Sequence, residues 1–140
     1  MKALITVFTL ILGLLIFQKS WAGESAYARE CRIAGGQLWV VTSADSREIP
    51  LCSFGEALIG AADFAEYKWS RKATASVRAY VHAASGASCS QVGAKTLPTA
   101  DSNGTEWMIC LFPDHSAIEA QTLARGSQDA DNAGLSQALQ

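Results

Sequence analysis

The 140-residue chain lacks most of the features on which common activities depend. It has two histidines and four cysteines, with neither a C-x-x-C pair nor a Cys/His cluster at metal-ligand spacing. No glycine-rich loop leads from a strand into a helix, which excludes a phosphate-binding loop. Basic residues are few and scattered and the net charge is −2, which disfavours binding to phosphate backbones. We therefore expect no cofactor, no metal and no nucleic-acid partner.

The first 22 residues have the layout of a secretory signal peptide. Met1 and Lys2 give a positive start, and residues 3–17 form an unbroken run of apolar or small residues. As a helix this run would span roughly 22 Å, which is short of the ~30 Å hydrocarbon core of a bilayer. We predict cleavage after Ala22, with Ala26-Tyr27-Ala28 as the alternative site. The mature chain would then be periplasmic or secreted, with no stable membrane span.

The four cysteines occur at one spacing that is used twice. Twenty residues separate Cys31 from Cys52, and twenty separate Cys89 from Cys110. The offset between the two pairs is 58 residues, and other positions follow it, including Gly35 with Gly93, Leu51 with Ile109, Phe54 with Phe112 and Glu56 with Asp114. This shared register indicates an internal duplication.

An even number of cysteines in an exported chain predicts a disulfide framework. Four cysteines allow three pairings, and the duplication selects one, because a module that once stood alone must close on itself. We therefore predict the disulfides Cys31–Cys52 and Cys89–Cys110. In the chain-entropy model each would contribute about 3 kcal/mol. Structural disulfides are favoured here over a metal site or a redox pair.

The local patterns predict an α+β fold made of two tandem helix–β-hairpin–helix modules, each closed by one disulfide. In the first module, residues 23–72, we expect a helix over 24–34, strands over 37–42 and 48–54, and a helix from residue 56. In the second module, residues 73–126, we expect a helix over 77–92 with a weak point at Ser85-Gly86. Strands over 95–99 and 105–112 and a helix over 117–125 follow.

Two further features of the second module carry predictions. Pro98 interrupts its first strand, which is typical of a sheet edge. Asn103-Gly104 is the strongest short signal for a hairpin turn. After Gly126 the chain is polar and rich in small residues, so we expect residues 127–140 to form a flexible tail.

The segments around the second cysteine of each pair resemble a small bacterial family, the domain of unknown function 333, whose members are often labelled hemolysins. The second copy is similar through Cys89, Gly93, Cys110, Phe112, Pro113, Asp114 and Ser116, and His115 stands where the family has glycine. The first copy is similar through Cys31, Gly35, Gly36, Cys52, Phe54 and Gly55 but lacks the Pro-Asp pair. Further cysteines of the family are missing from both copies. The resemblance implies a periplasmic or secreted domain and brings no established active site.

The residue pattern offers no catalytic constellation. His115 follows Asp114 and precedes Ser116, but neighbours in sequence are not a catalytic triad, and no nucleophile elbow surrounds the serine. We interpret Asp114 and Ser116 as capping residues of the following helix and His115 as a solvated turn residue. Trp39 and Trp107 lie on the two hairpins, where they fill the core or serve as binding anchors. The weak candidates for binding are therefore Trp39, Trp107, Pro113, Asp114 and His115.

These observations lead us to expect a non-enzymatic exported binding module. Its partner would be a periplasmic, envelope or extracellular protein. Two alternatives stay open. A secreted protease inhibitor would present a rigid loop, for which residues 113–116 are the candidate. A membrane-active toxin would need a long amphipathic or strongly basic segment, and the mature sequence shows neither.

Overall fold

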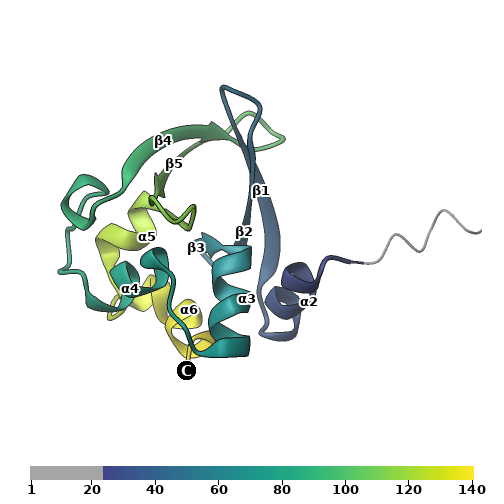
Figure 1. The fold of residues 1–140 in the computed structure, drawn as a ribbon, viewed down its shortest axis with the longest axis vertical. Coiled ribbons are helices and arrows are strands. Elements are labelled where there is room, and N and C mark those ends of the chain that lie inside the picture. The colour runs from purple at the N-terminus through teal and green to yellow at the C-terminus, as the bar shows by residue number, and fades with distance from the viewer. Residues whose placement is uncertain (1–23) are drawn as a thin grey trace, which may run out of the picture.

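A computed structural model describes residues 24–140 of the protein (Figure 1). The predicted signal peptide lies outside the described residues. The described chain mixes helix and strand, in agreement with the predicted α+β class. Its elements are α2 (Ala26–Ile33), β1 (Gln37–Ser43), β2 (Glu48–Phe54), β3 (Ala57–Gly60), α3 (Ala61–Ser70), α4 (Ala75–His82), η2 (Ser90–Val92), β4 (Lys95–Ala100), β5 (Glu106–Leu111), β6 (Ala117–Glu119), α5 (Ala120–Arg125), η3 (Ala130–Asn132) and α6 (Ala133–Ala138).

The six strands close into one barrel in the order β1-β2-β3-β6-β5-β4. Each half of the chain supplies an antiparallel three-stranded unit, β1-β2-β3 or β4-β5-β6, and the two units meet along β1–β4 and β3–β6. The two expected hairpin modules, packed against each other or side by side, are therefore in fact two halves of a single barrel. A lone hairpin leaves its edges unpaired and one face exposed, and closure with a second copy removes both problems.

The barrel keeps the 58-residue register of the sequence. At the β1–β4 joint, Thr42 pairs with Ala100, which is its own counterpart at that offset. At the opposite joint, β3 and β6 share one pair, Ile59 with Ile118. The halves are thus arranged about an approximate two-fold axis that passes close to both joints. Pro98, expected at a strand edge, comes immediately before the two β4 residues that pair with β1.

The third strand of each half was not predicted. Residues 57–60 form β3 and 117–119 form β6, where helices were expected to have begun already. Every residue of both strands is buried, so neither strand shows the polar–apolar alternation that distinguishes a half-exposed strand. A short, fully buried strand cannot be told from a buried helical turn by periodicity.

The helix expected over residues 77–92 is divided. α4 ends at His82, and the backbone turns at Gly86, which has a φ of 85°. Only the short η2 segment before Gly93 is helical again. The helix therefore ends before the weak point at Ser85-Gly86, since Ala83 is already extended with a ψ of 145°. The positive φ of Gly86 then prevents a right-handed helix from resuming there.

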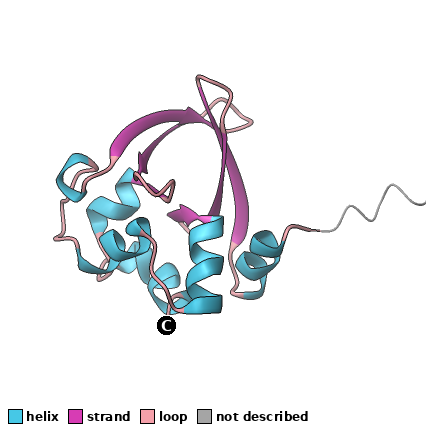
Figure 2. Cartoon of the chain, in the orientation of Figure 1, coloured by secondary structure: helices cyan, strands magenta, loops and turns pink. Residues whose placement is uncertain are grey.

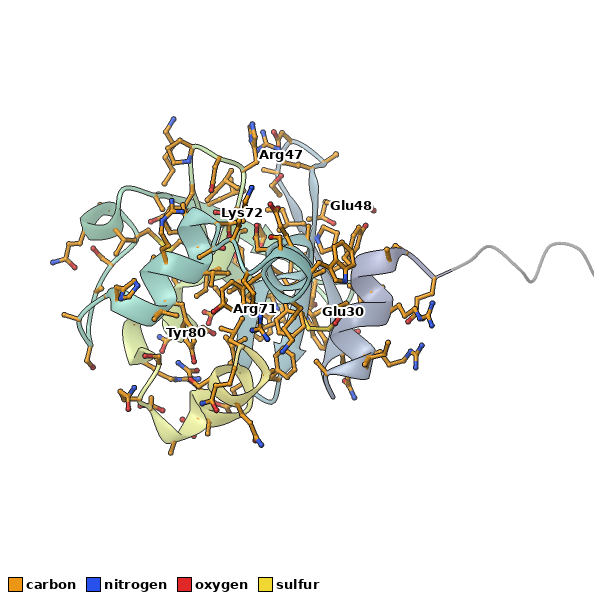
Figure 3. All side chains as sticks on the ribbon, turned by 60° about the horizontal axis from the view of Figure 1, so that its bottom comes forward. Glu30, Arg47, Glu48, Arg71, Lys72 and Tyr80 are labelled. Carbon is orange, nitrogen blue, oxygen red and sulfur yellow. A yellow bond between two sulfur atoms is a disulfide. The ribbon has the colours of Figure 1, made fainter. Side chains whose placement is uncertain are left out.

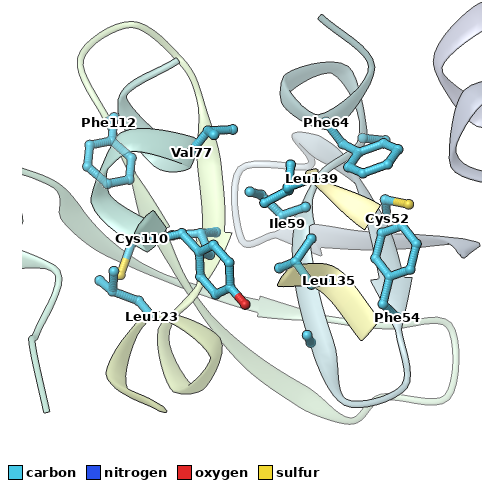
Figure 4. Close-up of a cluster of buried hydrophobic side chains, with 14 of the residues drawn as sticks. Cys52, Phe54, Ile59, Phe64, Val77, Cys110, Phe112, Leu123, Leu135 and Leu139 are labelled. Atoms are coloured by element: carbon cyan, nitrogen blue, oxygen red, sulfur yellow. The ribbon is translucent and has the colours of Figure 1, made fainter. Parts of the chain in front are cut away.

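Apolar side chains form two clusters, one on each face of the barrel wall. The inner cluster fills the barrel and consists of Val41, Ile49, Leu51, Leu58, Ile109 and Ala117. The outer cluster lies between the wall and the helices and includes Phe54, Phe64, Phe112, Leu123 and Leu135 (Figure 4). Figure 2 shows α3 to α6 gathered on one side of the strands. These helices supply Phe64, Leu123 and Leu135 to the outer cluster. The outer cluster joins residues of both halves into one core.

Both predicted disulfides are confirmed. Cys31–Cys52 ties α2 to β2, and Cys89–Cys110 ties the turn before η2 to β5. All four cysteines are buried within the outer cluster. Each bridge fastens the segment just before the first strand of its half to the second strand, and the two bridges occupy equivalent positions in the duplication.

The C-terminal segment is packed rather than flexible. Leu135 is fully buried and Leu139 nearly so, because residues four apart lie on the same face of α6. The side-chain amide of the buried Asn132 donates to the carbonyl oxygens of Thr122 and Gly126 at 2.9 and 2.8 Å. Residues 127–140 therefore complete the core, and the prediction of a flexible tail is wrong. No helix within residues 24–140 combines the length and apolarity needed to cross a bilayer.

Candidate functional site

Two clefts open where the halves of the barrel meet, at roughly equivalent positions of the duplication. The first, which we call the tryptophan cleft, has a volume of about 340 Å³. It is lined by Trp39, Ser53, Gly55, Glu56, Leu58, Trp107, Glu119, Gln121 and Arg125. The second, the Asp63 cleft, has a volume of about 250 Å³. It is lined by Tyr27, Arg47, Glu48, Ile49, Pro50, Gly60, Ala62, Asp63, Leu111, His115 and Ala117.

The structure brings the two hairpin tryptophans together. Trp39 on β1 and Trp107 on β5 come from different halves, yet their ring centroids are 6.2 Å apart with an interplanar angle of 74°. This edge-to-face arrangement is favourable for aromatic pairs. Both side chains are half-buried and rest against the inner cluster. Each ring therefore packs partly against the core and partly lines the cleft.

The two indole N–H groups differ in their partners. Trp107 Nε1 donates to Oδ2 of Asp101 at 3.1 Å. This hydrogen bond is the main reason why the pKa of Asp101 lies below its ordinary value. Trp39 Nε1 is buried and has no hydrogen-bond partner among residues 24–140. A buried donor without an acceptor is destabilising, so its retention needs an explanation.

Charged groups of the cleft are largely engaged with one another. Arg125, at the end of α5, pairs with Glu56 at 3.2 Å. Glu119 is buried at the start of α5, where its oxygens accept from the backbone N–H groups of Gln121 and Thr122 at 2.8 and 2.7 Å. This carboxylate caps the helix. Nη1 of Arg125 is buried and has no partner within the described part of the chain, so it is a second donor without an acceptor.

The Asp63 cleft holds a buried carboxyl group. Asp63 lies in the first turn of α3 with 8% of its surface exposed, and Oδ2 accepts the backbone N–H of Ala117 at 2.9 Å. Burial raises the pKa of Asp63 to about 6, and the nearby charge of Asp114 adds to the effect, while the hydrogen bond from Ala117 opposes it. Arg47 and Glu48 lie at the β1–β2 turn on the rim of this cleft (Figure 3).

The turn containing Pro113, Asp114 and His115 lies beside the Asp63 cleft and not beside the tryptophans. Asp114 caps α4, because Oδ2 accepts the backbone N–H of Ala75 at 2.9 Å, and Oδ1 accepts the Ser116 hydroxyl at 2.6 Å. Burial alone would raise the pKa of Asp114, but these hydrogen bonds outweigh it and hold the pKa below its ordinary value. Asp114 therefore caps a helix, but that helix is α4. The helix that follows the turn, α5, is capped by Glu119, so the predicted capping of the following helix by Asp114 is wrong.

His115 occupies an exposed turn with a φ of 67°, as expected for a turn residue. Glycine adopts this left-handed conformation without steric cost, whereas a residue with a Cβ atom does so rarely. Pro113 is exposed beside it. The five weak binding candidates thus separate into two places, with the tryptophans in one cleft and the turn next to the other.

Sequence reasoning did not single out Glu119, Gln121 and Arg125 as neighbours of the tryptophans. These residues come from the end of β6 and from α5, 80 or more positions after Trp39, and only barrel closure brings them to the tryptophans. Within residues 24–140, no three His, Cys, Asp or Glu side chains are placed to bind a metal ion together.

Comparison with known protein families, proteins and structures identifies no relative of this chain. No family model matches the sequence, and neither a curated protein nor a solved structure matches it. The function is therefore argued from the two clefts.

Proposed function

We propose that the protein is an exported, non-enzymatic binding module and that its ligand binds in the tryptophan cleft. The observation that carries the proposal is the convergence of two half-buried indoles with two unpartnered buried donors in one concave site. Ligand sites are typically apolar clefts of about 300–1,000 Å³ with a few placed polar groups. The volume of about 340 Å³ fits the lower end of that range.

The duplication provides an internal control for this interpretation. At the offset of 58 residues, Trp39 corresponds to Leu97 and Trp107 to Ile49. Both aliphatic residues also pack in or against the inner cluster. The barrel therefore accepts ordinary aliphatic side chains at these positions, so its closure does not require tryptophan. The two indoles are best explained by a ligand that contacts them.

A binding role also agrees with how the carboxylates are used. Asp63, Asp114 and Glu119 each accept backbone N–H groups at a barrel joint or a helix start. Such groups position the chain rather than transfer protons to a substrate. The tight turn at residues 113–116 is tied to α4 by Asp114, which is not the extended loop that a protease inhibitor would present.

Export to the periplasm or the medium is part of the proposal. The two buried disulfides are compatible with an oxidising compartment. The predicted signal sequence and the resemblance to the domain of unknown function 333 point the same way. A periplasmic, envelope or extracellular component is the expected source of the ligand.

NMR of the indole N–H groups tests this proposal. Residues 23–140 contain three tryptophans, two in the cleft and Trp69 on the exposed face of α3. Fractions of periplasm, envelope and culture medium are added to the isotope-labelled, disulfide-intact protein. We expect the signals of Trp39 and Trp107 to shift while that of Trp69 stays. If no fraction moves the two cleft signals, the cleft is not a binding site for any component of those fractions and the proposal fails.

A further inference from the structure

We infer that the ligand of the tryptophan cleft is a neutral oligosaccharide, an inference that rests on the proposed binding function. Its basis is the combination, within one cleft, of aromatic surface, donors without acceptors and a single guanidinium that is already paired with a carboxylate.

The unpartnered donors require a ligand with oxygen acceptors. Nε1 of Trp39 and Nη1 of Arg125 are both buried and both belong to side chains that line the cleft. An unsatisfied buried donor costs about 1–3 kcal/mol. Both donors are closed to water in this structure, so an acceptor on the ligand recovers this cost only when binding turns the side chains enough to open the N–H groups to the cleft. A purely apolar ligand would leave both donors unsatisfied, and a cationic ligand would place positive charge against two N–H groups.

The local charge disfavours an anion. Glu56, Glu119 and Arg125 line the cleft, so carboxylates outnumber the single guanidinium. The guanidinium is already paired with Glu56 at 3.2 Å and has Asp131 at 4.0 Å. An anionic ligand would have to compete with these carboxylates for Arg125. A neutral acceptor meets the remaining Nη1 without that competition.

The two indole rings favour sugar units as the ligand. Sugar rings present a face of C–H groups bordered by hydroxyl oxygens, and such a face packs on an aromatic ring while its oxygens reach nearby donors. Trp39 and Trp107 offer two ring systems at an angle of 74°, so adjacent sugar units can contact different rings. Indole combines apolar area with a polar N–H, which suits a ligand of this mixed character.

The shape of the surface favours a chain of sugars over a single unit. A second hollow of about 600 Å³ adjoins the cleft and shares Trp107, Glu119 and Gln121 with it. It continues past Met108, which is 44% exposed, to the segment around Ser88. Trp107 therefore lies between two connected hollows, which an oligomer can follow.

Titration with matched trisaccharides tests the inference. The probes are triacetylchitotriose and maltotriose, which are neutral, glucosamine trimer, which is cationic, trigalacturonate, which is anionic, and a capped neutral trialanine peptide. Each is added up to about 10 mM, a range that detects millimolar dissociation constants. We expect at least one neutral trisaccharide to shift the indole signals of Trp39 and Trp107 but not Trp69, and the charged trimers to have no such effect.

Substitutions taken from the other half of the barrel serve as controls. The double variant Trp39→Leu, Trp107→Ile carries the residues found at the equivalent positions, so we expect it to fold and to lose trisaccharide binding. Trp39→Phe keeps a ring but removes the unpartnered N–H, and we expect its dissociation constant to rise roughly three- to tenfold. Trp69→Phe should bind as the unmodified protein does. If the double variant fails to fold, Trp39→Phe still measures how much the indole N–H of Trp39 contributes to trisaccharide binding.

The outcomes separate this inference from the proposed function. Suppose that neutral trisaccharides leave both cleft signals unchanged while the peptide or a charged trimer shifts them. The inference of a neutral oligosaccharide is then overturned, and the proposed binding function stands. If neither the probes nor the cellular fractions shift them, both are overturned. Unaltered affinity in Trp39→Phe would contradict the role of the unpartnered donor.

Discussion

The backbone N–H of Ala117 in β6 donates a 2.9 Å hydrogen bond to Oδ2 of Asp63 in α3. This contact joins the two halves where β3 and β6 share only one backbone pair. A comparable link runs the other way, from the N–H of Leu58 in β3 to the hydroxyl of Thr122 in α5 at 3.0 Å. Side chains thus complete a barrel joint that strand pairing leaves short of hydrogen bonds, and the stability of this joint should depend on Asp63.

The raised pKa of Asp63 predicts an unusual pH dependence of stability. Its pKa is about 6 in the folded protein against an ordinary value of 3.8, so between these values the folded state binds more protons than the unfolded state. Stability from this group is therefore greatest at low pH and falls as the pH rises from about 4 to about 6, by on the order of 3 kcal/mol. Asp63→Asn retains an acceptor for Ala117 and does not titrate.

Urea unfolding at pH 4 and pH 7 measures this effect. We expect the free energy of unfolding of Asp63→Asn, relative to the unmodified protein, to increase between the two pH values by on the order of 3 kcal/mol. Taking the difference between variants cancels the contribution of other carboxyl groups. A difference that does not change with pH would show that Asp63 titrates as an ordinary aspartate.

Gly60 is predicted to be intolerant of any side chain. A Cβ at this position would lie 1.9 Å from Oδ2 of Asp63 and 3.2 Å from the carbonyl oxygen of Ala117. Gly60→Ala must therefore displace the carboxylate that links the halves, and overpacking of this kind costs about 1–3 kcal/mol. Gly134→Ala is the matched control, because its Cβ meets only Phe54 at 3.4 Å.

Thermal or urea unfolding of the two glycine variants gives the comparison. A double variant, Gly60→Ala with Asp63→Ala, identifies the cause, since removing the carboxylate should reduce the penalty of the added methyl group. Strictly additive effects would mean that the contact between Gly60 and Asp63 is not the source of the loss.

Each disulfide should stabilise the protein separately. Both bridges join cysteines 21 positions apart, and for a loop of this size the chain-entropy model gives about 3 kcal/mol. We expect Cys31→Ala with Cys52→Ala, and Cys89→Ala with Cys110→Ala, to lower the free energy of unfolding by similar amounts. Urea unfolding measures the loss, and peptide mapping without reduction verifies the remaining bridge. A large difference between the two variants would contradict their equivalence.

Removing a buried C-terminal side chain should be costly. Leu135 is fully buried in the outer cluster, so Leu135→Ala should destabilise the protein by about 2–5 kcal/mol. Gln137 lies exposed on the same helix, and Gln137→Ala should change stability by no more than about 0.5 kcal/mol. Equal, small effects in urea unfolding would mean that the C-terminal segment contributes little to the core.

Much of the local structure could be predicted because its signals are local. The strand at 48–54 has the predicted bounds. The ends of the first helix and of the first strand lie within two residues of the predicted ends. The β-branched and aromatic composition of β1, the Gly35-Gly36 stop and the Asn103-Gly104 turn are all contained in a few consecutive residues. The disulfide pairing followed from the repeated spacing.

The prediction failed where a residue's state depended on distant partners. Residues 57–60 and 117–119 are strands because each segment lies between a neighbouring strand and the opposite half of the barrel. The segment after Gly126 looked polar and mobile, yet Leu135 and Leu139 meet a cavity that other elements create. Neither context is visible within a short window of sequence.

The sequence by itself determined the duplication, the α+β class and the two disulfides, because these follow from spacing and from short-range preferences of the backbone. Only the tertiary structure decided that the two copies close one barrel. The same closure brought Trp39 beside Trp107 and separated both from Asp114 and His115. The physical reason is that each half has unpaired strand edges and an unfilled apolar face, which a second copy completes, and the clefts form where the two copies meet.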